Sequence, residues 1–202
     1  MRVRVWKTTK PFKGLQTGRR IQLKNNEYDF VKEEYANKIQ YQSARIYKNF
    51  TLKYKNEASN YNIRAVNPDH QFLEKTIIDE GRFLNERDLK DKAKVIVIGR
   101  LIKEDLFGEK IALGKRLNVN GSSYLIIGIF SDEGGDNEER LAYIPVTTAQ
   151  MIYGNNDYIS QIVLGYNPNL SLDAAIAFGN KMERDLRKRM NIHPDDQSAL
   201  SV

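Results

Sequence analysis

Residues 78–108 have the sequence IDEGRFLNERDLKDKAKVIVIGRLIKEDLFG, from which the fold class follows. Val95 to Ile98 form an unbroken β-branched run, which predicts a strand buried on both faces. The apolar residues after it recur at helical spacing and predict a short helix, which Gly108 can end in a left-handed conformation. A buried strand followed directly by a helix indicates a chain that mixes α and β structure.

The residues after this stretch predict further strands joined by turns. Asn120-Gly121 is typical of a two-residue hairpin turn, and the segments on both sides of it alternate between apolar and polar residues. Residues 131–139, SDEGGDNEE, predict a mobile acidic loop. After one more strand, Thr147 or Thr148 is expected to cap a short helix.

The residues before this stretch, and those at the far end of the chain, follow a related pattern. Period-two alternation from Ser43 to Tyr54, and again from Tyr61 to Ala65, predicts a hairpin. Near each end of the chain a strand precedes an amphipathic helix, the first beginning at Glu27 and the last capped by Ser171. The buried face of the last helix is predicted to comprise Leu172, Ala175, Ile176, Phe178, Met182, Leu186 and Met190.

Together these segments predict an α+β fold of two lobes. Residues 1–50 and 153–202 are alike in kind and are expected to form one discontinuous α/β lobe of paired β-α-β units. Residues 51–152 hold hairpins and short helices and are expected to form an inserted, mainly β lobe. A chain of 202 residues is long enough to bury a substantial core.

Composition excludes several classes of protein. The chain has no cysteine and two histidines, His70 and His193, which excludes disulfides, thiol catalysis, cysteine-ligated metals and most histidine-based sites. Both histidines are expected at the surface or as caps.

No run of the sequence reaches the about 18 apolar residues that a membrane-spanning helix needs, and no secretory signal precedes the first strand. The abrupt start and end lead us to expect a fragment of a larger protein.

Motifs for phosphate and cofactor binding are incomplete. Gly114-Lys115 is not part of a phosphate-binding loop, because Glu109 and Arg116 stand where that loop needs Gly and Ser or Thr. Gly99 is better explained as a helix start than as part of a nucleotide site. We therefore expect no cofactor, no resident metal and no catalytic residue. Calcium binding by the acidic loop and a pair of catalytic carboxylates remain open as alternatives.

The net charge of +6 indicates nucleic-acid binding as a different function, because basic surfaces attract nucleic acids. The basic residues form two groups, Lys10, Lys13, Arg19, Arg20 and Lys24 in the N-terminal loop and Arg184, Arg187, Lys188 and Arg189 at the end of the last helix. A basic nucleic-acid-binding module is thus one alternative function. A carboxylate-based hydrolase is a second alternative, which would need a cleft with two acids and a raised pKa on one of them.

An ordered series of motifs across residues 81–150 resembles one widespread family. The segment from Gly81 to Asp88, GRFLNERD, is similar to the GRFF-x-E-x-D segment of that family, with Leu84 in place of its second Phe. The series continues with Val95-Ile96-Val97-Ile98-Gly99, Leu106-Phe107-Gly108, Leu113-Gly114-Lys115, Val119-Asn120-Gly121, Ile127-Gly128-Ile129, Tyr143-Ile144-Pro145 and Thr147-Thr148-Ala149-Gln150. The chain thus resembles the periplasmic core domain of MacB-type ABC transporter permeases. Residues 9–20 and Pro194-Asp195-Asp196 resemble the variant in Bacteroidetes-like permeases.

This resemblance implies a domain excised from between the first two transmembrane helices of an inner-membrane permease, on its periplasmic side. It implies a Porter-like lobe for residues 1–50 and 153–202 and a Sabre-like lobe for residues 51–152. The family transmits conformational change, driven by a cytoplasmic ATPase, to the export or extraction of a substrate. The expected partners are the permease's own transmembrane helices, a second permease copy in a homodimer, the ATPase and, in many members, a periplasmic adaptor and an outer-membrane duct.

For partner contacts we expect the inserted lobe to present its acidic loop. The hypothesis names Asp132, Glu133, Asp136 and Glu138, whose carboxylates would lie exposed between two strands. Such a role needs charge and shape but no nucleophile or metal ligand. The substrate, and the choice between export and lipoprotein release, stay open.

Overall fold

The computed structural model describes residues 1–202, which form two compact units. The terminal lobe comprises residues 1–44 and 157–202, and the central lobe comprises residues 45–156. The borders expected from the sequence, after residues 50 and 152, lie a few residues from these.

The pairing of individual residues accounts for the borders of the lobes. Arg45 is already paired with Val66 in the hairpin of the central lobe. At the other border, the amide of Asn156 still donates to the carbonyl of Gln150. The chain therefore joins the central lobe at residue 45 and leaves it after residue 156.

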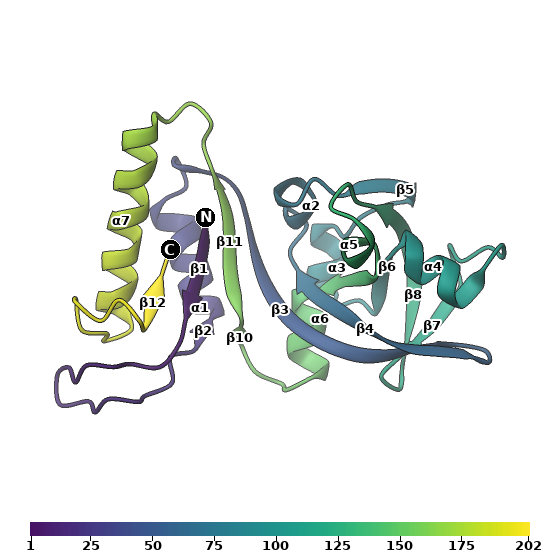
Figure 1. Cartoon of the computed structure of the whole chain (residues 1–202), viewed down its shortest axis with the longest axis horizontal. Coiled ribbons are helices and arrows are strands. Elements are labelled where there is room, and N and C mark those ends of the chain that lie inside the picture. The colour runs from purple at the N-terminus through teal and green to yellow at the C-terminus, as the bar shows by residue number, and fades with distance from the viewer. The chain divides into compact units, whose positions relative to one another are not determined.

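The terminal lobe is built from a sheet and two main helices (Figure 1). Its elements are β1 (Arg2–Val5), β2 (Leu23–Lys24), α1 (Asn25–Glu34), the first part of β3 (Ile39–Tyr54), β10 (Tyr158–Ile159), β11 (Gln161–Tyr166), α7 (Leu172–Arg189) and β12 (Leu200–Ser201). The strand order is β12-β1-β11-β3, and β2 pairs separately with β10. Because β11 lies between β1 and β3, and β1 lies between β11 and β12, two split β-α-β units interlock. The predicted paired units are confirmed.

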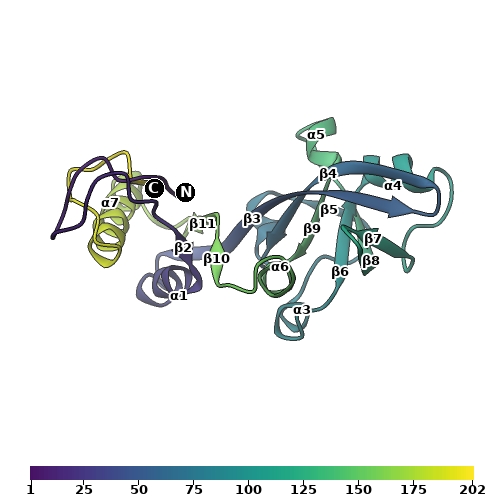
Figure 2. The same ribbon diagram turned by 90° about the horizontal axis from the view of Figure 1, so that it is seen from below.

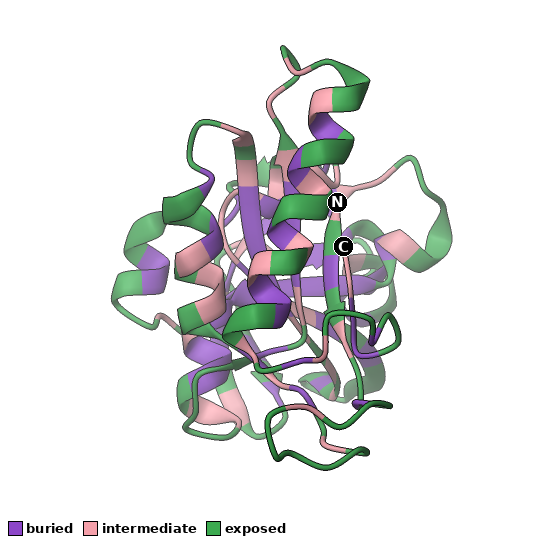
Figure 3. Cartoon of the chain, turned by 90° about the vertical axis from the view of Figure 1, so that its left-hand side faces the viewer, coloured by how far each residue is buried: buried purple, intermediate pink, exposed green.

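Helix α7 covers the sheet of this lobe with one apolar face. Phe178, Met182 and Leu186 are buried on that face, and Figure 3 shows the exposed outer side of the helix in green. Tyr35, directly after α1, contacts Phe178 edge to face with 5.2 Å between the ring centroids. The two helices therefore share one core on the same face of the sheet.

The central lobe is mainly β structure with short helices. Its elements after β3 are β4 (Glu57–Val66), α2 (His70–Leu73), β5 (Ile77–Gly81), α3 (Glu86–Lys90), β6 (Val95–Gly99), α4 (Arg100–Phe107), β7 (Arg116–Val119), β8 (Ser122–Ser131), α5 (Asp136–Glu139), β9 (Leu141–Pro145) and α6 (Val146–Ile152). The strand order is β3-β4-β9-β6-β8-β5. The pairs β4–β9 and β6–β8 are parallel, and the others along this path are antiparallel.

Strand β7 closes this sheet into a ring. It pairs with β8 after the Asn120-Gly121 turn and also with β3, where Leu52 faces Val119 and Lys53 faces Asn118. Six strands, β3-β4-β9-β6-β8-β7, thus form a closed barrel without a free edge. Its core is filled by fully buried side chains from these strands, among them Leu52, Ile63, Ile96, Leu117, Ile126 and Ile144.

A second apolar cluster supports the outside of the barrel. Phe83, Phe130 and Tyr143 are buried there, and the rings of Phe83 and Phe130 both pack against Tyr143. Phe83 belongs to the Gly81-Arg82-Phe83-Leu84 segment that resembles the family motif. One role of this segment is therefore to bury an aromatic ring against the sheet. None of the helices is both long and apolar enough to cross a membrane.

Several local predictions are confirmed and others are wrong. Asn120 and Gly121 have positive φ angles of 49° and 91°, as the predicted hairpin turn requires. Gly108 ends α4 with a φ of 57°. Leu172 and Ile176, however, are 72% and 53% exposed, because they lie on the side of α7 that faces away from the sheet.

The predicted helix cap at Thr147 or Thr148 is also wrong. Pro145 stands at the N-cap of α6, and both threonines lie inside the helix. Thr147 donates its hydroxyl to the carbonyl of Leu89, and Thr148 donates to that of Ala93. The two hydroxyls therefore tether α6 to the end of α3, and Figure 2 shows these helices close together.

Candidate functional site

The acidic segment 131–139 connects β8 to β9 in the central lobe. Asp132 accepts a hydrogen bond of 2.7 Å from the amide of Gly134, which starts a tight turn. Gly135 has a φ of 101°, a conformation that favours glycine, and α5 begins directly after it. The segment predicted as a loop therefore contains a one-turn helix.

The side chains of this segment divide into exposed and internally bonded ones. Glu133 and Asp136 are exposed, whereas Asp132 and Glu138 are partly buried. Glu138 forms an ion pair of 3.3 Å with Arg64 on β4. The exposed charge of the segment thus comes mainly from two of the four predicted partner-contact residues.

Glu139, which the sequence analysis did not single out, anchors the segment. Its side chain is buried and pairs with Arg100 on α4 at 2.6 Å. A Cβ atom on Gly99 would lie 2.1 Å from the carbonyl oxygen of Glu139, so only glycine allows this close approach. Gly99 also stands at the N-cap of α4, which confirms its predicted role at a helix start.

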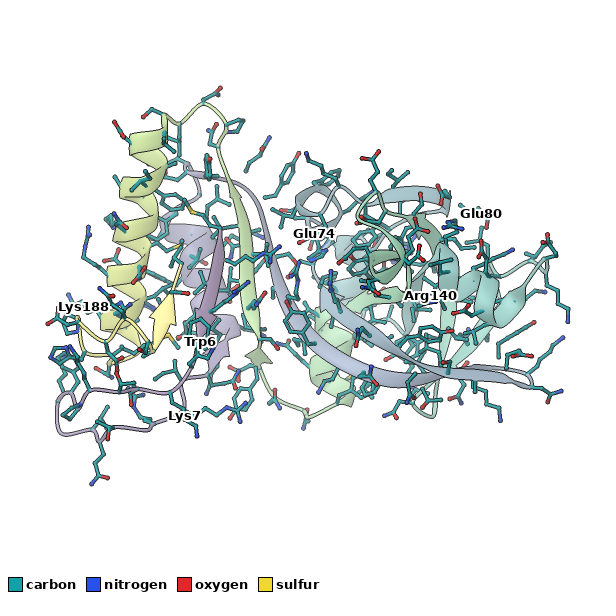
Figure 4. All side chains as sticks on the ribbon, viewed as in Figure 1. Trp6, Lys7, Glu74, Glu80, Arg140 and Lys188 are labelled. Carbon is teal, nitrogen blue, oxygen red and sulfur yellow. The ribbon has the colours of Figure 1, made fainter.

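Beside the acidic segment lies a cavity of about 500 Å³ that the sequence analysis also missed. It opens between the outward side of the β3–β4 hairpin, α4, α5 and the start of β9. Its walls include three asparagines of the hairpin, Asn49, Asn60 and Asn62, and Arg140, which is labelled in Figure 4. The sequence pattern that indicates this cavity is the recurrence of asparagine at alternate positions of the hairpin. The pattern shows a shared polar face only once the strand register is known.

The acidic segment offers hydrogen-bond acceptors and negative charge. Asp132, Glu133, Asp136 and Glu138 do not form a group that could hold a metal ion, nor does any other cluster of His, Asp and Glu in the chain. The exposed carboxylates of Glu133 and Asp136 can attract basic groups of a partner.

Several of the basic residues predicted to form a binding surface instead make contacts within the terminal lobe. Arg187 is buried and donates to the carbonyls of Asp196 and Leu200 while pairing with Glu183. Arg19 donates to the carbonyls of Met190 and Asn191. These two arginines hold the N-terminal loop and the C-terminal segment against the end of α7 instead of forming a binding surface.

Three further basic side chains lie over aromatic rings. Lys13 lies over the ring of Phe12 and Lys24 over the ring of Tyr158, each with about 5.4 Å to the centroid. Arg189 lies 4.2 Å over the ring of Phe30. The exposed charge of the second group thus rests mainly on Arg184 and on Lys188, which Figure 4 labels.

The two histidines have different environments. His193 is partly exposed and accepts a hydrogen bond from the amide of Asp195, which fits the predicted cap. His70 is fully buried, so its predicted surface position is wrong. Its Nε2 atom faces the guanidinium of buried Arg45 at 2.7 Å, and this arginine also pairs with Glu74 at 2.5 Å. A buried arginine requires such partners, and the α2 turn supplies both of them.

The carboxyl groups give no support to an acid–base site. The carboxyl pKa values that depart from the ordinary range, those of Asp185 and Asp196, are both lowered. Hydrogen bonds from Lys181 and Tyr35 lower the pKa of Asp185. A general acid would need a raised pKa beside a second carboxylate, and these two residues instead hold elements together.

The family comparison rests on nearly the whole chain. Residues 2–177 match the model of the MacB-like periplasmic core domain. The chain belongs to this family. Membership locates it in the periplasmic or extracellular region of a MacB-like transporter, and it supports neither the nucleic-acid-binding nor the hydrolase alternative.

Curated relatives of this family member are much longer than the chain. The macrolide export ATP-binding/permease protein MacB of Wolinella succinogenes is 31% identical over 108 residues, covering 52% of the chain and 17% of the relative. MacB of Chlorobium phaeobacteroides is 26% identical over 151 residues, covering 73% of the chain and 22% of the relative. The chain thus spans about a fifth of the length of these relatives.

Solved structures of the family have the same fold. The extracellular domain of the noncanonic ABC-type transporter YknZ from Gram-positive bacteria matches with a TM-score of 0.82 and 16% identity, covering 100% of the chain and 98% of that structure. The periplasmic region of MacB from Actinobacillus actinomycetemcomitans matches with a TM-score of 0.77 and 19% identity, covering 95% and 85%. The two-lobe α+β fold is thereby confirmed.

Proposed function

We propose that this chain is the extracytoplasmic part of an ABC transporter permease and that it transmits conformational change from a cytoplasmic ATPase to the movement of a substrate. Family membership over residues 2–177 is the observation that carries this proposal. In this function the terminal lobe is Porter-like and the central lobe is Sabre-like. The domain itself is non-catalytic, and ATP is hydrolysed elsewhere in the transporter.

The proposed position of the domain is between two transmembrane helices of the permease. Strand β1 pairs antiparallel with β12, with Arg4 opposite Ser201, so both ends of the chain lie on neighbouring strands of the terminal lobe (Figure 1). Two helices that continue from these ends would pull on the same sheet. Force on that sheet would be shared by the interlocked β-α-β units, which suits a mechanical part better than a single hairpin would.

The proposed partners follow from this function. They are the transmembrane helices of the permease, a second copy of the permease, the ATPase, a periplasmic adaptor and an outer-membrane duct. The exposed carboxylates of Glu133 and Asp136 are the proposed contact for the adaptor, with Asp132 and Glu138 beside them. Asp136 stands at the start of α5, which buried Glu139 anchors, and Glu133 lies in the turn before it, so both carboxylates can face a basic surface together.

A topology experiment tests the extracytoplasmic location on which the proposed function depends. The chain has no native cysteine, so Ile111→Cys provides a single reactive thiol at a side chain that is 73% exposed. In the full-length protein, with any other cysteines replaced by Ala, a membrane-impermeant maleimide should label this residue in intact spheroplasts. Labelling that requires permeabilised cells would contradict the proposal. Leu23→Cys, at a fully buried position, is the control for unfolding.

A further inference from the structure

The cavity of about 500 Å³ in the central lobe has unusually polar walls for a small-molecule site. Its lining residues come from five elements, β3, β4, α4, α5 and β9, and from Arg140 between the last two. Its volume lies in the usual range for such sites, which are mostly apolar. A ligand that fits these walls must therefore be hydrophilic.

One wall consists of carboxamides that are held in fixed orientations. Asn49 and Asn62 face each other across the β3–β4 pair, and Asn49 Nδ2 donates to Asn62 Oδ1 at 3.0 Å. Thr51 donates to Asn60 Oδ1 at 2.6 Å. These bonds use the carbonyl oxygens of Asn60 and Asn62, so their amide N–H groups point away as donors, while the carbonyl of Asn49 stays available as an acceptor.

The rest of the lining, which includes Arg64 on the same face of β4, carries charges that cancel. Arg64 pairs with Glu138 at 3.3 Å, and Arg140 pairs with Asp105 at 3.2 Å. Tyr61 donates to Asp105 at 2.9 Å, and burial together with this hydrogen bond raises the pKa of Tyr61, so it remains a donor at all physiological pH values. Two cations and two anions leave no surplus charge with which to attract an ion.

An aromatic ring lies beside the cavity on the same outward face of the hairpin. Tyr47 stands two residues before Asn49 and opposite Arg64, and it is 47% exposed. Its hydroxyl accepts a hydrogen bond from Arg45 at 3.1 Å, which fixes the ring. Tyr47 is outside the cavity lining and Arg45 lies 5.8 Å over one side of its ring, so the ring offers its other side to a ligand that extends past Arg64.

We propose that this cavity binds an uncharged carbohydrate. Sugar hydroxyls both donate and accept, which matches a wall of amide donors facing carboxylate acceptors and guanidinium donors. Neighbouring hydroxyls can bridge the two partners of the Asp105–Arg140 pair, and the C–H face of a sugar ring can lie against Tyr47. Phosphates and carboxylates lack a net positive site here, and apolar ligands lack an apolar wall. The inference rests on the cavity and does not depend on transport.

The test uses the 202-residue chain labelled with ¹⁵N, whose asparagine side-chain amides give signals of their own. Glucose, galactose, mannose, N-acetylglucosamine, maltose and N,N′-diacetylchitobiose are titrated separately at tens of millimolar, and sodium phosphate is titrated as the anion control. At least one sugar should shift the amide signals of Asn60 and Asn62 in a saturable manner, equally at low and high salt. The proposal is overturned if no sugar shifts them, or if phosphate does so and the sugars do not.

Matched variants assign the binding to the cavity. Asn62→Val removes an amide from the wall, and Lys53→Val makes a comparable change on the outward face of β3 outside the cavity. Affinity for the best sugar should fall about tenfold or more in Asn62→Val and stay unchanged in Lys53→Val. Equal thermal midpoints of the two variants exclude unfolding as the cause. Equal affinity of both variants would place the sugar elsewhere and overturn the proposal.

Discussion

At the scale of single residues, the stability of the central lobe depends on a glycine that the family-like motif contains. Gly99 lies where a Cβ atom would come within 2.1 Å of the Glu139 backbone. Gly99→Ala should therefore lower the free energy of unfolding by about 1–3 kcal/mol, because the acidic segment must move away from β6. Urea unfolding followed by circular dichroism measures this change.

Gly179→Ala is the matched control for that substitution. Gly179 lies in the middle of α7, and a Cβ atom there would make ordinary contacts with the side chain of Met1, the nearest atom being 3.4 Å away. Alanine should stabilise the helix by about 0.5–1 kcal/mol. Similar losses in both variants would contradict the assigned role of Gly99.

A second residue-scale prediction concerns the acid sensitivity of the terminal lobe. Burial by itself would raise the pKa of Asp196, but hydrogen bonds from Thr9 and from the amide of Lys10 outweigh this effect, so the pKa lies below the ordinary range. Because the folded-state pKa is the lower one, the carboxylate stabilises the fold above the unfolded-state pKa. This contribution is lost as the pH falls through the folded-state pKa.

Asp196→Asn should accordingly cost about 1–3 kcal/mol at neutral pH, because an amide cannot accept all these hydrogen bonds. The difference from the native chain should shrink in strong acid. Unfolding free energies measured at both pH values, with the exposed Asp195→Asn as control, test this. A difference that stays constant with pH would show that the charge of Asp196 is not the source of the stabilisation.

At the scale of elements, the closure of the barrel by β7 can be tested with a disulfide. Lys53 on β3 and Asn118 on β7 are directly opposite each other, and the chain has no other cysteine. Opposite residues in an antiparallel pair have Cα atoms about 4.5–5.5 Å apart, which a disulfide can span. The variant Lys53→Cys/Asn118→Cys should oxidise readily, as mass spectrometry would detect.

The control for this pair uses the other neighbour of Asn118. Ser123 on β8 faces Asn118 from the opposite side, so Lys53→Cys/Ser123→Cys places a strand between the two thiols. This second variant should stay reduced under the same conditions. Equal oxidation of both pairs would mean that β7 does not keep its register between β3 and β8.

This closure also shows how far sequence reasoning reaches. The Asn120-Gly121 turn, the end of α4 at Gly108 and the Ser171 cap of α7 are local, since each depends on backbone conformations that the residues themselves favour. The pairing of β7 with β3 joins segments far apart in the chain, and no local pattern encodes it.

The errors at Thr148 and His70 have the same origin. A threonine near a helix start resembles a cap, but here the hydroxyl of Thr148 bonds to Ala93, which only the packing of α6 on α3 brings near. His70 resembles a surface residue until buried Arg45 is placed against it. The same distinction applies to the candidate site. Its acidic residues are adjacent in the sequence and could be identified there, whereas the asparagines of the adjacent cavity lie on one face only because of the hairpin register.

At the scale of the whole molecule, the proposed contact with an adaptor depends on which charges of the domain are exposed. In the acidic segment, Glu133 and Asp136 are exposed, whereas Glu138 is paired with Arg64. Reversal of the exposed pair, Glu133→Lys/Asp136→Lys, should weaken binding of the proposed periplasmic adaptor to the full-length permease by about tenfold or more without changing thermal stability. Affinity is measured with the purified permease in detergent.

Glu138→Lys separates this effect from one on the fold. It places a lysine against Arg64, so it should lower the thermal midpoint as well as adaptor binding, because like charges then meet beside the barrel. Glu57→Lys, an exposed reversal at the tip of the β3–β4 hairpin, should leave both unchanged. If the reversals at Glu133 and Asp136 left adaptor binding and transport as they were, the adaptor would contact another surface. The exposed bases Arg184 and Lys188 of the terminal lobe would then be the next residues to reverse.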